Sequence, residues 1–301
     1  MSKLRQQLQD YIEENGVSQK ALEKPIGYSS SVISQYLEDI YKGDVKAVET
    51  AVEQFLAREN DRRSQSKEKL AFTPTASAKK ALALVRSAHL MGVFNALIGD
   101  PGLGKTVSLE QYQSKYPRKV LFIAAHKGYS ARAMIIKLHT LLGGDGVGSQ
   151  AYLTEEIIKL IKGGDRCILI DEADHLNLGC LEIIRHIHDM TECGLILAGT
   201  QKLMMNLRGK RKQLEQLYSR LHDTVRLDRL SPEDTEKLIG TALPNSSGLW
   251  KTFHEHCNGN ARILSHFIAR SKRLAERNKG EVTAEIITEI ARKHKAALGI
   301  A

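Results

Sequence analysis

GDPGLGKT, residues 99–106, is the stretch that decides the fold of this chain. It fits the pattern GxxxxGK[ST], and it connects an apolar segment that should form a strand to a segment that should form a helix. Glycines let backbone N–H groups curl around phosphates, and the positive end of the helix adds to the attraction. We expect the whole loop to line a nucleotide site: Gly99, Asp100, Pro101, Gly102, Leu103, Gly104, Lys105 and Thr106. Lys105 would reach the β and γ phosphates and the Thr106 hydroxyl would bind a metal ion, so the loop predicts ATP and Mg²⁺ as cofactors.

Apolar strands and amphipathic helices alternate along the chain on both sides of this loop. The predicted strands are residues 93–98, 119–125, 167–170, 195–199 and 224–230, and the predicted helices include 78–91, 131–142, 151–162 and 178–190. Because nearly continuous apolar strands alternate with helices, the pattern predicts an α/β fold with a parallel sheet covered on both faces. Beyond residue 231 the apolar spacing is only helical, which predicts a small helical domain.

These patterns divide the chain into four predicted parts. Residues 1–60 form a helical domain, 61–77 a linker, 78–230 the α/β core and 231–301 a helical lid. The linker prediction rests on the polar stretch RENDRRSQSKEKLAFTPTAS, residues 58–77, which has no periodicity.

The stretch ILIDEADHL, residues 168–176, is an apolar strand that ends in two carboxylates, and Asp171 follows Thr106 by 65 residues. We expect Asp171 to hold the Mg²⁺ ion and Glu172 to polarise the attacking water. Asp174 and the following histidine need no catalytic role, because a helix start and solvent contact account for them. The letters DEADH also suggest a helicase, but the 127 residues after Asp174 are too few for a second nucleotide-binding domain of about 150 residues.

Three later residues complete the predicted catalytic set. Thr200 follows the next strand, where a polar side chain can reach the γ phosphate and the water. Arg220 precedes the last strand, and an arginine there typically projects into the nucleotide of a neighbouring subunit. A DNA contact or a salt bridge is the alternative for Arg220. Arg262, in the lid sequence GNAR, would touch a phosphate from the lid.

Taken in this order, the phosphate loop, acidic strand end, polar sensor, late arginine and lid arginine resemble an AAA+ P-loop NTPase. Within that superfamily the chain resembles the phage Mu B family of transposition proteins, with TnsC-type and IstB-type relatives. SQKALEKPIGYSSSVISQYLEDIYKGD, GDPGLGKT, ILIDEADHL, LILAGT and GNARIL carry the resemblance. It implies an ATPase that binds double-stranded DNA largely without sequence preference, forms a homo-oligomeric helical filament and stimulates a partner transposase. Thr200 stands where the family has an Asn-like residue.

The net charge of +9 is unevenly distributed. Residues 1–70 hold 11 basic and 12 acidic side chains, whereas residues 71–301 hold 33 and 23. Such a basic field favours a polyanion, although a solvated basic surface is the simpler explanation. The expected DNA contacts lie after the second strand and in the run RGKRK: Lys127, Arg132, Arg208, Lys210, Arg211 and Lys212. Their affinity would fall steeply with salt.

The sequence of the first domain predicts a helix-turn-helix. Leu22 occupies a core position of the first helix, Gly27 permits the turn, and Ser29 caps a second helix whose buried face includes Ile33 and Leu37. The exposed face of that second helix holds serines and a glutamine but no Lys or Arg, so a small helical protein-interaction domain is the alternative.

Other functions and the cellular compartment follow from smaller signals. An ATP-driven helicase loader, a transcription factor with an ATPase domain and a secretion ATPase share parts of this pattern. The near-neutral first domain disfavours the transcription factor, and the missing apolar span disfavours the secretion ATPase.

Four widely spaced cysteines form no CxxC pair, and the charged N-terminus has no apolar signal segment. We therefore expect a protein of the bacterial or phage-infected host cytosol that has no membrane partner.

Overall fold

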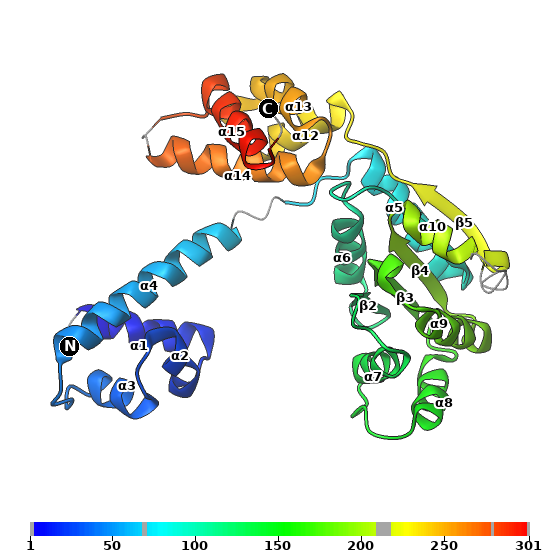
Figure 1. Ribbon diagram of the computed structural model, residues 1–301, viewed down its shortest axis with the longest axis horizontal. Coiled ribbons are helices and arrows are strands. Elements are labelled where there is room, and N and C mark those ends of the chain that lie inside the picture. Colours follow the sequence, from blue (N-terminus) through cyan, green and yellow to red (C-terminus); the bar gives the residue numbers. More distant parts are fainter. Residues whose placement is uncertain (1–2, 68–70, 209–217, 278–279, 300–301) are drawn as a thin grey trace. The chain divides into compact units, whose positions relative to one another are not determined.

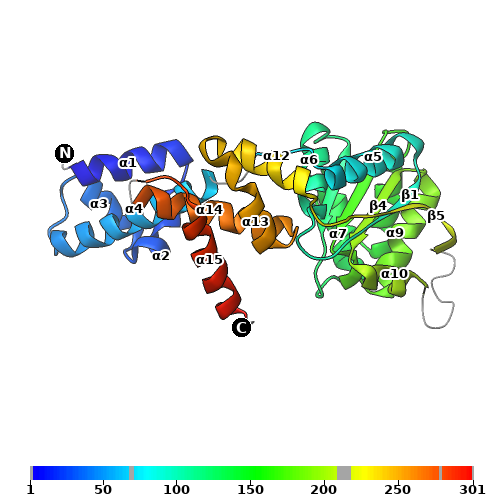
Figure 2. The ribbon, with the colours of Figure 1, turned by 90° about the horizontal axis from the view of Figure 1, so that it is seen from above.

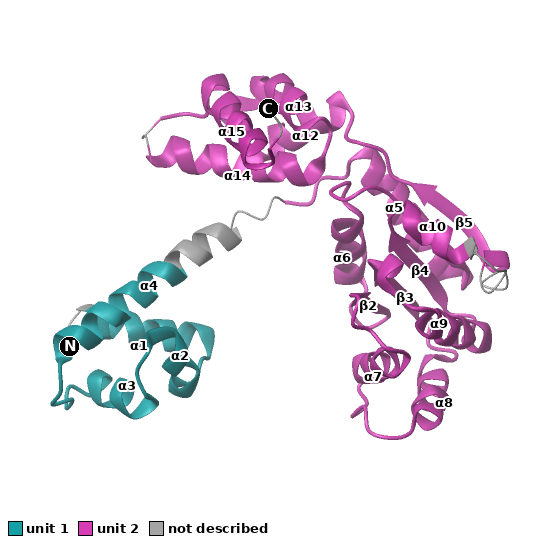
Figure 3. Cartoon of the chain, in the orientation of Figure 1, with its two compact units in different colours: residues 1–70 teal, residues 71–301 magenta. Residues whose placement is uncertain are grey.

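The structure is a computed structural model that describes residues 3–67, 71–208, 218–277 and 280–299, with side chains except at 60–67 and 208 (Figure 1). Contacts divide the chain into two compact units, residues 1–70 and residues 71–301 (Figure 3). None of the helices in the described ranges is long and apolar enough to cross a membrane.

The first unit is a bundle of helices. Its elements are α1 (Lys3–Asn15), η1 (Gln19–Leu22), α2 (Glu23–Ile26), α3 (Ser30–Leu37) and α4 (Val45–Lys67). Leu22, Ile33 and Leu37 are buried, as predicted. Gly27 ends α2 with φ +86°, and the Ser29 hydroxyl accepts a hydrogen bond from the Val32 N–H at the start of α3. The sequence therefore correctly places the turn and the helix cap.

Helix α4 extends into the stretch predicted to be a linker. It continues to Lys67, whereas the prediction ends the helical domain at residue 60. Residues 61–67 contain no glycine or proline, and arginine, glutamine and lysine are good helix formers even without an apolar face. At the other end of the predicted linker, Thr75 caps α5 (Ala76–Met91) by accepting the Ala78 N–H at 3.1 Å.

The second unit contains a five-stranded sheet in which every pair of neighbours is parallel. Its strands are β1 (Phe94–Ile98), β2 (Val120–Ala124), β3 (Cys167–Asp171), β4 (Gly194–Gly199) and β5 (Leu221–Arg226), in the order β2-β3-β4-β1-β5. All residues of β1, β3 and β4 are buried, which explains why these strands are apolar throughout.

Two hydrophobic cores lie on the two faces of this sheet. Residues of α5 and α6 (Lys105–Lys115) form one core with side chains of the strands. The other core contains residues of α7 (Ala131–Leu141), α8 (Gln150–Ile161), α9 (Leu178–Thr191) and α10 (Gln201–Arg208). Figure 2 shows α5 and α10 on opposite sides of the strands. The predicted α/β fold is confirmed.

The last strand lies earlier than the sequence predicts. We expected residues 224–230, but β5 ends at Arg226. Leu227 still donates to the Ile98 carbonyl at 2.8 Å, after which Leu230 donates instead to the carbonyl of Gly259, also at 2.8 Å. β5 is an edge strand with an exposed surface, so its own residues have little apolar pattern. The buried residues Leu227 and Leu230 lie beyond its end, and their apolar side chains led us to predict the strand too late in the sequence.

The helices after β5 pack around their own apolar side chains. They are α12 (Pro232–Ala242), η3 (Pro244–Leu249), α13 (Trp250–Cys257), α14 (Ala261–Arg277) and α15 (Ala284–Ala297). Phe253, Phe267 and Ile287 are almost completely buried. The buried Asp234 carboxylate accepts the Ala76 N–H with both oxygens at 3.0 Å, so this lid is fastened to the start of α5.

Glycine-to-alanine substitutions at two positions should change stability in opposite directions. A Cβ at Gly194 would lie 2.6 Å from the Ala88 carbonyl oxygen, so we expect Gly194→Ala to destabilise the second unit by about 1–3 kcal/mol. A Cβ at Gly240, within α12, would meet nothing within 4 Å, so Gly240→Ala should stabilise it by about 0.5–1 kcal/mol. Denaturant unfolding followed by circular dichroism measures both; equal midpoints would contradict the packing of β4 against α5.

Candidate functional site

The phosphate loop connects β1 to α6, as predicted. Gly102 and Gly104 have φ values of +85° and +89°, a conformation that side-chain-bearing residues rarely adopt. Gly104 is the N-cap of α6, which begins at Lys105. The first N–H groups of a helix have no partner within it, so they can bind an anion at this end. The loop is therefore shaped for phosphate.

Lys105 lies over the loop that carries it. Its Nζ donates to the carbonyls of Gly99 at 2.6 Å and Asp100 at 3.1 Å. Partial burial is the main cause that lowers the pKa of Lys105, and the nearby Asp171 and Asp174 carboxylates oppose this shift. The site therefore holds a partly desolvated cation next to carboxylates.

The predicted metal ligands meet at the end of β3. Thr106 Oγ1 donates to Asp171 Oδ2 at 2.5 Å, and Asp171 Oδ1 accepts the Glu172 N–H at 2.9 Å. Hydroxyl and carboxylate oxygens suit Mg²⁺, which usually binds one or two protein oxygens together with phosphates and water. Thr106 and Asp171 supply two such oxygens, which leaves the other positions around an ion to phosphate and water.

Glu172 projects from the end of β3 toward solvent. Its backbone has φ +54°, and its side chain is 61% exposed. Its Oε2 lies 3.8 Å from His175 Nε2. The carboxylate is thus accessible to water beside Asp171, which is a predicted metal ligand.

Thr200 is held by Asp174, for which we predicted no catalytic role. Asp174, in the turn η2 (Ala173–His175), accepts the Thr200 N–H at 3.3 Å and its hydroxyl at 3.4 Å. The Asp174 carbonyl also accepts Asn206 Nδ2 at 3.3 Å. Because Asp174 also contributes to the field at Lys105, it lies within the nucleotide site. The sequence signal that could have indicated this role is the position of Asp174, an acidic residue three positions after Asp171 at the end of β3.

The lid reaches the phosphate loop through Asn260. Its Nδ2 donates to the Pro101 carbonyl at 3.1 Å, while the Arg262 N–H donates to the Gly102 carbonyl at 3.2 Å. Asn260 Oδ1 accepts the N–H groups of Arg262 and Ile263, at 3.0 and 3.1 Å, at the start of α14. Arg262 also lowers the pKa of Lys105 electrostatically, so its charge lies near the site. Sequence analysis identified Arg262 but not Asn260.

Arg220 lies away from these residues. It precedes Leu221, which pairs with Phe94 at the start of β1, whereas the phosphate loop follows the end of β1. A five-residue strand spans roughly 15 Å, so Arg220 cannot reach the site of its own chain. Its Nε lies 3.3 Å from Asp189 Oδ1, and its side chain is half exposed.

The predicted DNA contacts are only partly described. Lys127 is exposed in the loop after β2, and Arg132 is exposed in α7, where its Nη2 donates to the Gly148 carbonyl at 3.1 Å. The side chain of Arg208 lies outside the described residues, as do Lys210, Arg211 and Lys212 entirely.

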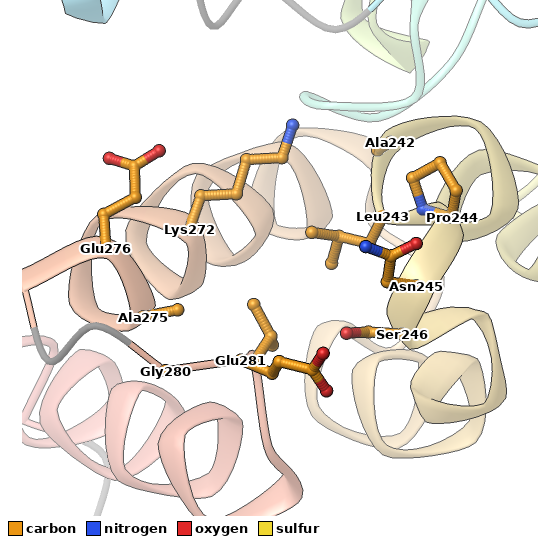
Figure 4. Close-up of a pocket in the computed structure, with 11 residues that line it drawn as sticks. Ala242, Leu243, Pro244, Asn245, Ser246, Lys272, Ala275, Glu276, Gly280 and Glu281 are labelled. Atoms are coloured by element: carbon orange, nitrogen blue, oxygen red, sulfur yellow. The ribbon is translucent and has the colours of Figure 1, made fainter.

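A separate pocket of about 350 Å³ lies within the lid (Figure 4). Its lining comes from the end of α12, the start of η3, α14 and the segment before α15, and includes Lys272, Glu276 and Glu281. None of the predicted site residues lines it.

Comparisons with known proteins agree with this architecture. A family model described as an AAA domain matches residues 93–207. Mu-like prophage FluMu DNA transposition protein B of Haemophilus influenzae is 25% identical over 78% of this chain and 82% of its own length. The ATP-dependent target DNA activator B of Escherichia phage Mu is 24% identical over 93% of this chain and 91% of its own length.

A solved structure gives the same fold. The Aeropyrum pernix ORC2 protein, determined in complexes with ADPNP and ADP, matches with a TM-score of 0.54 at 12% identity, over 74% of this chain and 68% of that one. The resemblance to phage Mu B proteins and the AAA+ fold are therefore confirmed. Residues 93–207 are thus similar to AAA domains, and the chain is an ATPase.

Asp174 should affect turnover rather than nucleotide binding. Asp174→Ala releases Thr200, so we expect kcat for ATP hydrolysis to fall about 10²-fold, as for other losses of alignment at a reacting centre. ATP affinity should change little, because Lys105 and the loop backbone remain. Asp174→Asn keeps an oxygen for the Thr200 N–H and should retain most of the activity. Steady-state kinetics with equilibrium nucleotide binding measures both; an equally inactive Asn variant would contradict an orienting role.

Proposed function

We propose that this chain is an ATP-dependent DNA-binding regulator of transposition that assembles on target DNA and activates a partner transposase. Two observations together support the proposal. The chain has a candidate nucleotide site, and the relatives that match most of it are named as a DNA transposition protein B and an ATP-dependent target DNA activator. The site accounts for the ATP dependence in those names.

ATP and Mg²⁺ would be held by the residues that surround the phosphate loop. The loop N–H groups and Lys105 would bind the phosphates, while Thr106 and Asp171 would hold the ion. The exposed Glu172 carboxylate would accept a proton from the attacking water, and Thr200 would orient that water. Bound Mg²⁺ supplies neutralisation of the charge that develops on the phosphates.

A second copy of the chain would complete this site. Arg220 is half exposed at the edge of the sheet opposite the phosphate loop, where it can reach the nucleotide of a neighbour. An arginine supplied in this way stabilises transition-state charge, so hydrolysis would depend on assembly. We propose a helical filament as the assembled form.

DNA would bind through basic side chains of the second unit. Residues 71–301 carry a charge of +10, and Lys127 lies in the loop that follows β2, at the carboxyl edge of the sheet. Lys127, Arg132 and the run 208–212 would contact phosphates, which gives little preference for sequence. The helix-turn-helix of the first unit would add weak DNA contacts or contact the transposase.

Electron microscopy with duplex DNA of random sequence tests the proposal. We expect regular filaments that require ATP and Mg²⁺ and disappear at high salt. Glu172→Gln should lower hydrolysis about 10²- to 10⁴-fold, since a general base contributes that much, and its filaments should persist longer.

Two outcomes would contradict this function. Closed rings without DNA would favour a helicase loader. Particles bound only at particular sequences would favour a transcription factor.

Lys127 should contribute one phosphate contact. Lys127→Ala should weaken binding to all duplexes alike and make the slope of log K against log[salt] shallower by about 0.9. Lys115→Ala is a matched control, because Lys115 is also exposed but ends α6, at the far end of that helix from the phosphate loop. Fluorescence anisotropy across salt concentrations measures the slopes; equal slopes for the two variants would exclude Lys127 from the DNA interface.

A further inference from the structure

The segment Ala173–Asn177 connects two parts of the second unit. On one side, Asp174 holds Thr200 beside the nucleotide site, with distances of 3.3 and 3.4 Å. On the other side, Asn177 Nδ2 donates to the Tyr129 carbonyl at 3.3 Å, in the loop that carries Lys127. Only His175 and Leu176 separate Asp174 from Asn177, so a displacement at one contact is transmitted over a very short distance.

The orientation of the Asn177 amide is fixed by a second hydrogen bond. Its Oδ1 accepts the Cys180 N–H at 2.9 Å and thereby caps α9. Since the oxygen is engaged there, the NH₂ group must face the Tyr129 carbonyl. The same carbonyl also accepts the Cys180 thiol at 3.6 Å. One side chain therefore joins the start of α9 to the loop after β2.

This loop is fastened to the acidic strand at its start, and at its end it contacts the sheet core and the start of α9. Before Lys127, the Ala125 N–H donates to the Asp171 carbonyl at 2.9 Å. After it, Tyr129 packs partly buried against the sheet core, and a Cβ at Gly179 would lie 3.6 Å from the Ala131 Cβ. Lys127 itself is exposed between these attachments. Lys127 therefore lies two residues from the backbone hydrogen bond that joins Ala125 to Asp171.

We propose that Asn177 is a positioning residue that couples DNA contact at the loop 126–130 to ATP hydrolysis. The proposal rests on the function proposed above. DNA held by Lys127 would fix the loop, the Asn177 amide would fix η2, and Asp174 would then hold Thr200 in the orientation that hydrolysis requires. The same contacts would also couple the affinities for DNA and ATP. Coupling between two binding equilibria is reciprocal, so the bound nucleotide would change the affinity for DNA.

Substitutions at Asn177 can remove the link and keep the helix cap. Asn177→Asp keeps an oxygen for the Cys180 N–H but turns a carboxylate oxygen toward the Tyr129 carbonyl. Asn177→Ser is neutral, can still cap α9, and is too short to reach Tyr129. Thr283→Asp is the matched control, because Thr283 caps α15 and the change adds the same charge at a distant helix start.

Two ratios test the coupling in the full-length chain. The first is ATP turnover with random-sequence duplex DNA divided by turnover without it. The second is the DNA dissociation constant with ADP divided by that with a non-hydrolysable ATP analogue. We expect both ratios to be about fivefold or more in the wild type, the usual range for coupled sites, and to fall close to one in both Asn177 variants. The Asn177 variants should keep the thermal midpoint of the wild type, and their turnover without DNA should stay within about twofold of it. Both ratios of the control Thr283→Asp should also lie within about twofold of the wild-type ratios, which is below the usual range for coupled sites.

Several outcomes would overturn the proposal. Asn177 variants with wild-type ratios would show that the link carries no coupling, and a loss of DNA-free turnover with a lower thermal midpoint would reduce Asn177 to a helix cap. Wild-type DNA binding that does not depend on nucleotide would also reject coupling while leaving the DNA-binding function intact. Absence of duplex binding in every nucleotide state would reject the proposed function itself.

Discussion

The register of the parallel sheet is the constraint on which the nucleotide site depends. Ile98 pairs with Gly199 and Ala124 pairs with Asp171, so the carboxyl ends of four strands lie at one edge. The phosphate loop, Asp171 and Thr200 all follow from those ends. Because successive side chains of a strand point to opposite faces, a slip of β3 by one residue would turn Asp171 away from Thr106. Such a slip would also move a carboxylate into the apolar core around β3, and the cost of burying that charge opposes it.

The phosphate loop is rich in glycine, yet contacts at its ends and with the lid fix its conformation. β1 and α6 set its ends, and the lid residue Asn260 binds the Pro101 carbonyl from above. Gly102 has no side chain because one would collide with that same asparagine. The burial that lowers the pKa of Lys105 is part of this arrangement, because desolvation strengthens its attraction to phosphate. A site whose dipoles are already oriented has little reorganisation to make when a nucleotide binds.

Local patterns predicted most of the fold, but they indicated only those candidate site residues that lie close together in the sequence. The phosphate loop and the acidic strand end could be identified because their residues are close in sequence. Asp174 and Asn177 could not, because their partners Thr200 and Tyr129 lie 26 and 48 residues away and only the packed sheet brings them together. The bounds of β5 failed for another reason, as an edge strand has no regular burial pattern to detect. Helix α4 passed its predicted end because residues 61–67 include good helix formers and no glycine or proline, although their sequence has no apolar periodicity.

The two ends of the parallel strands carry different groups, so the two sides of the protomer that they form are unlike. One edge holds the phosphate loop, and the other holds Arg220, which a neighbour's nucleotide would need. A contact between unlike edges cannot have two-fold symmetry, so it generates either a closed ring or an open helix. Residues 71–301 carry a charge of +10, and copies brought together would therefore repel one another. A polyanion that contacted every copy would remove this repulsion and release its counterions, so the charge supports the proposal that the copies assemble on DNA rather than without it.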